Sequence, residues 1–183
     1  MKPHASLLLA LGIAAAACSD NQLQPAQIDN VVDTVTLGAL VGTGISVPSA
    51  YSIPDARAVR TDQTASFDFA YNVDATGRHL LLPLDALGLG AVNGSNPGMQ
   101  RSTETFAGIT NPPTNDYLTK DTLVAAVGNV FIARSRIACY LGVPEYAKLQ
   151  ILSFDETKRT VTFQVLANVN CGYRNLEIGI PTS

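Results

Sequence analysis

The chain has 183 residues, a formal net charge of −3 and only 15% charged residues. This length suits one domain that builds its own core. A mildly acidic chain lacks the basic surface of a nucleic-acid binder, so we expect no nucleic-acid partner. A hydrophobic content of 46% excludes a disordered acidic tail.

The N-terminus has the layout of a signal peptide. Lys2 and His4 precede a charge-free run of mostly Leu and Ala, Ala5–Ala17. This run is shorter than the roughly 20 apolar residues of a transmembrane helix, so residues 1–17 are predicted to be a signal peptide. An ordinary secretory signal cleaved after Ala17 would leave Cys18 as a free thiol.

The end of this run, Ala15-Ala16-Ala17-Cys18, resembles the lipobox of bacterial lipoproteins. The resemblance implies cleavage before Cys18, diacylation of its thiol and acylation of its new amino group. Ser19 follows where family members held at the inner membrane carry Asp, which implies an anchor in the outer membrane, on its periplasmic or surface face. Residues 18–30 are polar and are expected to be a lipidated tether, followed by a single β domain over residues 31–183.

The mature chain is rich in short extended runs separated by Gly, Pro and Asn, which favours an all-β fold. No sustained helical stripe interrupts them, although Leu84–Leu89 suits one helical turn. We expect an antiparallel β-sandwich or open barrel, immunoglobulin-like in its general pattern. The strand candidates are Val31–Leu37, Ser66–Val73, Arg78–Leu84, Thr122–Ser135, Ala147–Phe154, Thr160–Ala167 and Tyr173–Ile178.

Two hairpins are predicted. In Thr160–Ala167 apolar and polar residues alternate, Ala147–Phe154 alternates with an irregularity at Leu152, and turn residues 155–158 join the two runs. Upstream, a turn over residues 72–77 joins two further strands. One face of the first of these is expected to carry Phe67, Phe69, Tyr71 and Val73.

The middle of the chain combines an apolar run with a segment rich in Gly, Asn and Pro. Thr122–Ser135 contains Gly128-Asn129 and predicts either two strands at a tight turn or one strand with a bulge. Gly88–Pro113 is rich in Gly, Asn and Pro and is expected to be a long loop, either mobile or functional.

Three cysteines are an odd number for an exported chain, and a lipidated Cys18 makes the remainder even. Cys139 and Cys171 would then pair in an oxidising compartment. A metal or nucleophilic site needs further ligands or a His base, and neither cysteine has one nearby in sequence. We therefore predict a disulfide that contributes roughly 3 to 4 kcal/mol.

Signatures of catalysis are missing, so we do not expect an enzyme, a metal site or a cofactor. The mature chain has one histidine, His79, and no nucleophile elbow, P-loop or HExxH motif. Asp68, Asp74 and Asp85 flank the upstream hairpin without the spacing of a calcium loop. They are interpreted as solvated acids of turns and strand edges.

The expected ligand contacts are His79 and three tyrosines near the proposed disulfide, Tyr140, Tyr146 and Tyr173, because tyrosine offers flat contact area at low entropic cost. Packing around the disulfide is the alternative role. Arg134, Arg136 and Arg174 are expected to gather near one end of the sheet, either in surface salt bridges or around an anion.

Three successive strands resemble part of the HmuY-type haem-capturing lipoproteins: residues 130–134, 146–154 and 161–163. The resemblance implies an all-β fold on an outer-membrane lipid anchor. Members of the founding type hold haem iron between two histidines, whereas this mature chain offers only His79, with Met99 as the other candidate ligand. Fold and anchor are carried over, and the haem ligand set is not.

These observations predict a lipid-anchored lipoprotein of the bacterial envelope that acts as a non-catalytic binding or interaction module. Its partners would be the membrane, through the lipid, and a protein, for example as an accessory subunit of a membrane complex. The alternative is HmuY-like capture of haem or another small ligand.

Overall fold

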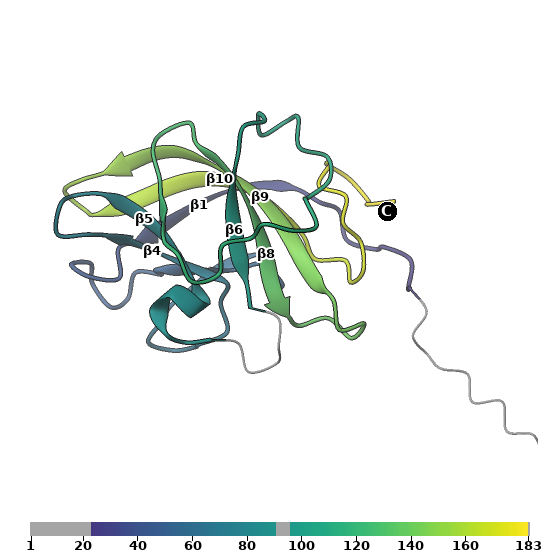
Figure 1. Cartoon of the computed structure of the whole chain (residues 1–183), viewed down its shortest axis with the longest axis horizontal. Coiled ribbons are helices and arrows are strands. Elements are labelled where there is room, and N and C mark those ends of the chain that lie inside the picture. Colours follow the sequence, from purple (N-terminus) through teal and green to yellow (C-terminus); the bar gives the residue numbers. More distant parts are fainter. Residues whose placement is uncertain (1–22, 91–95, 183) are drawn as a thin grey trace, which may run out of the picture.

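The computed structural model describes residues 23–90 and 96–182, so the predicted signal peptide and Cys18 lie outside the described residues. The described chain is all-β, with two five-stranded antiparallel sheets that pack as a sandwich and do not close into a barrel (Figure 1). Within these ranges no helix is long and apolar enough to span a membrane.

The first sheet has the strand order β1-β10-β9-β8-β6 and the second the order β3-β2-β4-β5-β7. A single 3-10 turn, Leu84–Leu87, follows β5 where one helical turn was predicted. The strands of the first sheet are β1 (Val32–Gly38), β10 (Thr160–Asn168), β9 (Pro144–Asp155), β8 (Val130–Ile137) and β6 (Gly98–Ser102); those of the second are β3 (Arg57–Val59), β2 (Ala50–Ser52), β4 (Phe69–Val73), β5 (His79–Pro83) and β7 (Leu123–Val124).

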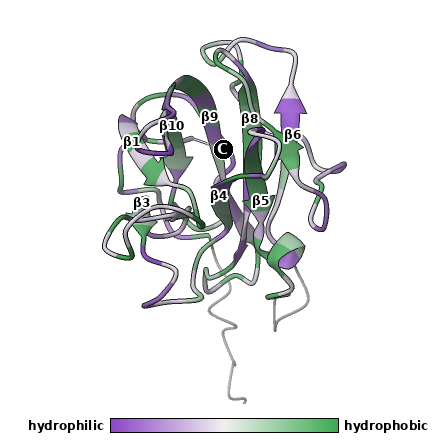
Figure 2. Cartoon of the chain, turned by 90° about the vertical axis from the view of Figure 1, so that its left-hand side faces the viewer, coloured by the Kyte–Doolittle hydropathy of each residue, from purple (hydrophilic) through white to green (hydrophobic). Residues whose placement is uncertain are grey.

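The main core lies between the sheets, where hydrophobic residues of both face one another (Figure 2). The predicted alternation of β10 is confirmed, because Val161, Phe163 and Val165 point into this core. The ring of Phe163 packs on the rings of Tyr51 and Phe69 from the opposite sheet. The distance between ring centres is 6.1 Å in both pairs. These aromatic contacts bury large apolar areas and fix how the sheets face each other.

The hairpin of β9 and β10 contains a β-bulge. Its register shifts between Thr162, opposite Ser153, and Phe163, opposite Ile151, so Leu152 is left over. Leu152 is 41% exposed, whereas Ile151 belongs to the core. The irregularity seen at Leu152 in the sequence is therefore an extra residue in one strand.

The outer face of the first sheet is covered as well. Ile109, from the segment after β6, and Leu176, from the segment after β10, pack there on Ile132 and Leu166. Lys148 of β9 is buried beneath this cover, where its ammonium donates to the Ile109 carbonyl at 2.8 Å and lies 4.8 Å from the Phe106 ring centre. Burial lowers the pKa of Lys148.

The long loop expected over Gly88–Pro113 is wrong in part, because β6 lies inside it and pairs with β8. Met99 of β6 is buried in the main core. Gly98 is required by close packing, since a Cβ there would lie 2.9 Å from the Tyr117 Cβ. The glycine that suggested a loop instead permits a strand beneath Tyr117.

Two other expectations are wrong, and a third is confirmed in one of its two forms. Tyr173–Ile178 is not a strand, and the adjacent Gly179 makes only an isolated bridge, with Asn30. Thr122–Ser135 forms two strands joined by a turn, the first of the two predicted alternatives, and the strands belong to different sheets. Phe67 precedes β4 and packs on the outer face of the second sheet, away from Phe69.

Candidate functional site

The predicted disulfide between Cys139 and Cys171 is present, with the two Cα atoms 5.4 Å apart. Cys139 lies in the loop between β8 and β9, and Cys171 lies just after β10. The bond therefore joins two segments at one end of the sandwich. The turns of the β4–β5 and β9–β10 hairpins lie at the opposite end of the sandwich from the disulfide (Figure 1).

An apolar pocket of about 320 Å³ lies beside the disulfide. Arg174 stacks its guanidinium 5.0 Å from the ring centre of Tyr146 and donates to the Pro112 carbonyl at 2.8 Å. Such stacking holds a cation on a mainly apolar wall. The pocket is lined by Leu23, Leu141, Val143, Pro144, Tyr146, Gly172 and Arg174.

The three tyrosines predicted as ligand contacts lie at this end of the sandwich. Tyr146 lines the apolar pocket, whereas Tyr140 and Tyr173 line an adjacent hollow of about 270 Å³. The tyrosines and the disulfide are therefore neighbours, as their spacing suggested.

The second half of the segment expected to be a tether packs against this end. The side-chain oxygen of Asn170 accepts hydrogen bonds from the backbone N–H groups of Gln27 and Ile28, both at 3.0 Å. Leu23 packs so closely on Gly172 that a Cβ on this glycine would lie 2.5 Å from the Leu23 Cδ1 atom. Leu23 thus lines the apolar pocket, and residues 24–28 line the adjacent hollow.

His79, the fourth predicted contact, lies at the opposite end of the sandwich. Its Nδ1 atom is 2.7 Å from the Tyr71 hydroxyl and its Nε2 atom is 2.9 Å from a Glu156 carboxylate oxygen. Its ring stacks on Phe154 with centres 3.6 Å apart. Burial raises the pKa of Tyr71 to about 12. Both imidazole nitrogens are engaged, and Met99 is buried in the core, so this geometry presents no open pair of haem ligands.

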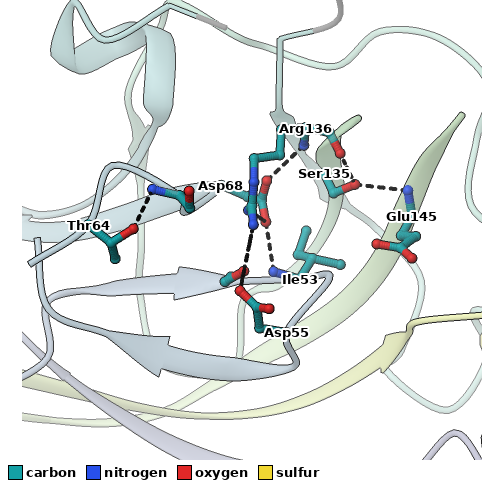
Figure 3. Close-up of polar contacts among 9 residues, drawn as sticks. Ile53, Asp55, Thr64, Asp68, Ser135, Arg136 and Glu145 are labelled. Atoms are coloured by element: carbon teal, nitrogen blue, oxygen red, sulfur yellow. Dashed lines mark hydrogen bonds and ion pairs between the residues drawn. The ribbon is translucent and has the colours of Figure 1, made fainter. Parts of the chain in front are cut away.

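The expectation that Asp68 is a solvated acid is wrong. Asp68 is 1% exposed and links the segment just before β4 to β8 through Arg136. One carboxylate oxygen accepts from the Arg136 backbone N–H at 2.7 Å, and the other accepts from its guanidinium at 3.1 Å (Figure 3). The second oxygen also accepts from the Ile53 backbone N–H at 2.7 Å.

The other two acids have local roles. Asp74 accepts hydrogen bonds from the backbone of Thr76 and Arg78 in the β4–β5 turn, which lowers its pKa. Asp85, in the 3-10 turn, accepts from the Asn96 side chain at 2.9 Å. No group of three or more His, Cys, Asp or Glu within residues 23–90 and 96–182 is arranged to hold a metal ion.

The three arginines divide between two environments. Arg134 lies 4.9 Å from the ring centre of Tyr117, whose ring centre is 6.2 Å from that of Tyr146, so Arg134 and Arg174 flank an aromatic pair. Arg136 instead turns toward Asp68, because the register of β8 and β9 shifts between Arg134 and Ile137. The arginines therefore do not form one cluster.

Glu145 is buried beside Arg136 and was not anticipated from the sequence. Glu145 is 5% exposed, and its Oε2 atom has no hydrogen-bond partner among the described residues. Its backbone N–H donates to the Ser135 hydroxyl at 2.9 Å (Figure 3). Burial, together with the negative charges of Asp68 and Asp55, raises its pKa to about 7, and Arg136 opposes this shift.

This raised pKa predicts a pH-dependent stability. The folded protein binds the Glu145 proton more tightly than the unfolded chain, so the free energy of unfolding should fall by about 2 kcal/mol as the pH rises from about 4.5 to about 7. Glu145→Gln should lose this decline and be more stable than the wild type at pH 8. Urea unfolding across this pH range measures the difference.

The matched control is Glu104→Gln, a change at an exposed position, which should keep the wild-type pH profile. The pKa of Asp68 is also raised, but Asp68 is present in all three proteins, so the comparison isolates Glu145. Parallel pH profiles for the wild type and Glu145→Gln would show that the buried carboxyl does not control this dependence.

No protein-family model, curated protein or solved structure matches this chain.

Proposed function

We propose that this protein is a lipid-anchored lipoprotein of the bacterial envelope, held in the outer membrane, that acts as a non-catalytic binding module. The observation that carries the binding role is the apolar pocket lined by Tyr146 and Arg174 beside the disulfide. Pockets with apolar walls and a few oriented polar groups are typical ligand sites. The anchor rests on the sequence around Cys18.

The non-catalytic part of the proposal is supported by how the titratable groups are used. Asp68 is committed to Arg136 and to backbone N–H groups, and both nitrogens of His79 are engaged. A general base needs a free position within hydrogen-bond reach of a substrate. These pairs stabilise the sandwich instead. Haem capture, the alternative suggested by the HmuY resemblance, gains no support from His79 and Met99.

The first prediction of this proposal concerns the anchor. Full-length protein purified from bacterial membranes should have a mature N-terminus at Cys18 that carries a diacylglyceryl group and an amide-linked acyl chain, as read by mass spectrometry. Cys18→Ser should abolish both modifications and processing at this site. A mature chain with an unmodified Cys18 would contradict the anchor.

The second prediction concerns the pocket. A photo-crosslinking benzoylphenylalanine in place of Val143, which lines the pocket, should give an adduct in intact cells that mass spectrometry identifies as a defined lipid or protein. The same reporter in place of Lys158, whose side chain is 78% exposed at the other end, is the matched control. Equal adduct yields at both positions would contradict a binding role for the pocket.

A further inference from the structure

Three segments without any charged residue meet at the disulfide end of the sandwich: residues 23–28, 138–144 and 169–173. The disulfide joins the second to the third, and Asn170 holds the first through two backbone N–H groups. These segments lie together at the end of the sandwich where the described chain begins (Figure 1). A surface with so few charged residues is unusual for a soluble domain.

Large apolar side chains protrude from this surface. Tyr140 is 56% exposed, Leu23 is 50% exposed and Val143 is 36% exposed. With Leu141, they form what we term the disulfide face. Contiguous exposed apolar side chains mark places where a protein contacts another apolar partner.

The opposite end of the molecule carries more charged side chains, together with the exposed Val41 and Ile45 of the loop after β1. Its two hairpin turns carry Asp74 and Arg78, and Asp155 and Lys158, as exposed ion pairs. The two ends of the sandwich therefore differ in charge. The hairpin turns carry two ion pairs, whereas Arg174 is the charged residue that lines the pocket at the disulfide end.

The length of chain before the disulfide face identifies what covers it. Leu23 is the fifth residue after Cys18, and five fully extended residues span at most about 18 Å. We infer that the disulfide face lies against the lipid bilayer, with Leu23, Tyr140 and Val143 at the boundary between headgroups and acyl chains. This inference rests on the proposed lipid anchor at Cys18.

The chemistry of the face suits this partner. Tyrosine is enriched at membrane interfaces because its ring is apolar and its hydroxyl is polar. Arg174 supplies a positive charge at the pocket, where its guanidinium donates to the neutral carbonyl groups of Pro112 and Pro113. A guanidinium in that position attracts anionic headgroups. A short tether would hold this face against the bilayer once the lipid has inserted.

The absence of tryptophan from the chain allows a direct test. Tyr140→Trp and Val143→Trp each place one tryptophan on the disulfide face, and Thr157→Trp places one in the exposed β9–β10 turn. Full-length protein purified from membranes is reconstituted into phosphatidylethanolamine and phosphatidylglycerol vesicles, with or without brominated acyl chains. Tryptophan emission from the Tyr140→Trp and Val143→Trp variants should move to shorter wavelength and be quenched by the brominated lipids, whereas emission from the Thr157→Trp variant should not.

The same preparations are analysed by mass spectrometry at Cys18. An acylated protein whose reporters at positions 140 and 143 are no more quenched than the reporter at position 157 would overturn the inference and leave the proposed anchor standing. A chain without acylation would overturn the anchor, and the inference with it. Two reporter positions, 140 and 143, are used so that the result does not depend on a single substitution that disturbs the fold.

Discussion

Arg136→Ala should lower the free energy of unfolding by about 3 to 5 kcal/mol at neutral pH, because it leaves a buried carboxylate without its cation. Asp68 is 1% exposed and receives both a backbone and a side-chain hydrogen bond from Arg136. The guanidinium also donates to the Ser52 hydroxyl at 3.2 Å. Chemical denaturation measures the loss.

The pH dependence of this loss identifies its cause. Burial already raises the pKa of Asp68, and removal of Arg136 should raise it further. The unpaired carboxyl is then tolerated when protonated, so the destabilisation by Arg136→Ala should be smaller at pH 4.5 than at pH 7.5. Arg101→Ala, at an exposed position of β6, is the matched control and should change stability little. An equal loss from Arg136→Ala at both pH values would mean that lost packing, rather than the unpaired charge, causes it.

Removal of the disulfide is the second large change. The bond joins residues 32 positions apart, and closing a loop of that length stabilises a fold by roughly 3 to 4 kcal/mol on the chain-entropy model. Cys139→Ser combined with Cys171→Ser should therefore lower the free energy of unfolding by about that amount. The loss is measured by urea denaturation under oxidising conditions.

The reduced wild-type protein is the control for the serine substitutions, and it should unfold at the same urea concentration as the double variant. Proteolysis adds a local readout, because Asn170, next to Cys171, binds the backbone of Gln27 and Ile28. We expect faster cleavage in residues 23–28 of the double variant. An unchanged midpoint in oxidised, reduced and substituted proteins would contradict a stabilising role for the bond.

The parts of the fold that could be predicted are those whose signal lies within one run of residues. Val161, Phe163 and Val165 alternate with polar residues and face the core as expected. The disulfide followed from counting cysteines. Local patterning and a simple pairing constraint were sufficient in these cases.

The strands that the sequence did not predict are either very short or contain a residue that is typical of turns. β2 and β3 have three residues each, too few to show a period of two. β6 contains a glycine that packing against Tyr117 requires, and this glycine reads locally as a turn residue. Tyr173–Ile178 alternates like a strand, but its Asn175 carbonyl accepts from the side chains of Asn30 and Asn168 rather than from a neighbouring strand.

The buried charges could not be predicted because their partners are distant in sequence. Asp68, just before β4, and Arg136, in β8, are separated by 68 positions. Glu145 follows Pro144 in a stretch that reads as a turn, and only the fold shows that its carboxyl points inward. At the candidate site, the sequence identified the tyrosines, whereas the contribution of residues 23–28 depends on hydrogen bonds to Asn170.

The pairing of β1 with β10 has a consequence for how the chain reaches its native state. Val32 of the first strand lies opposite Leu166 of the last, so this edge of the sandwich is completed only when almost the whole chain is available. During synthesis from the N-terminus, β1 stays without its partner while every other strand is made. Such long-range pairing slows folding and leaves strands open to wrong partners in the meantime. The sheet edge formed by β1 and β10 should therefore be the last part of the first sheet to be completed.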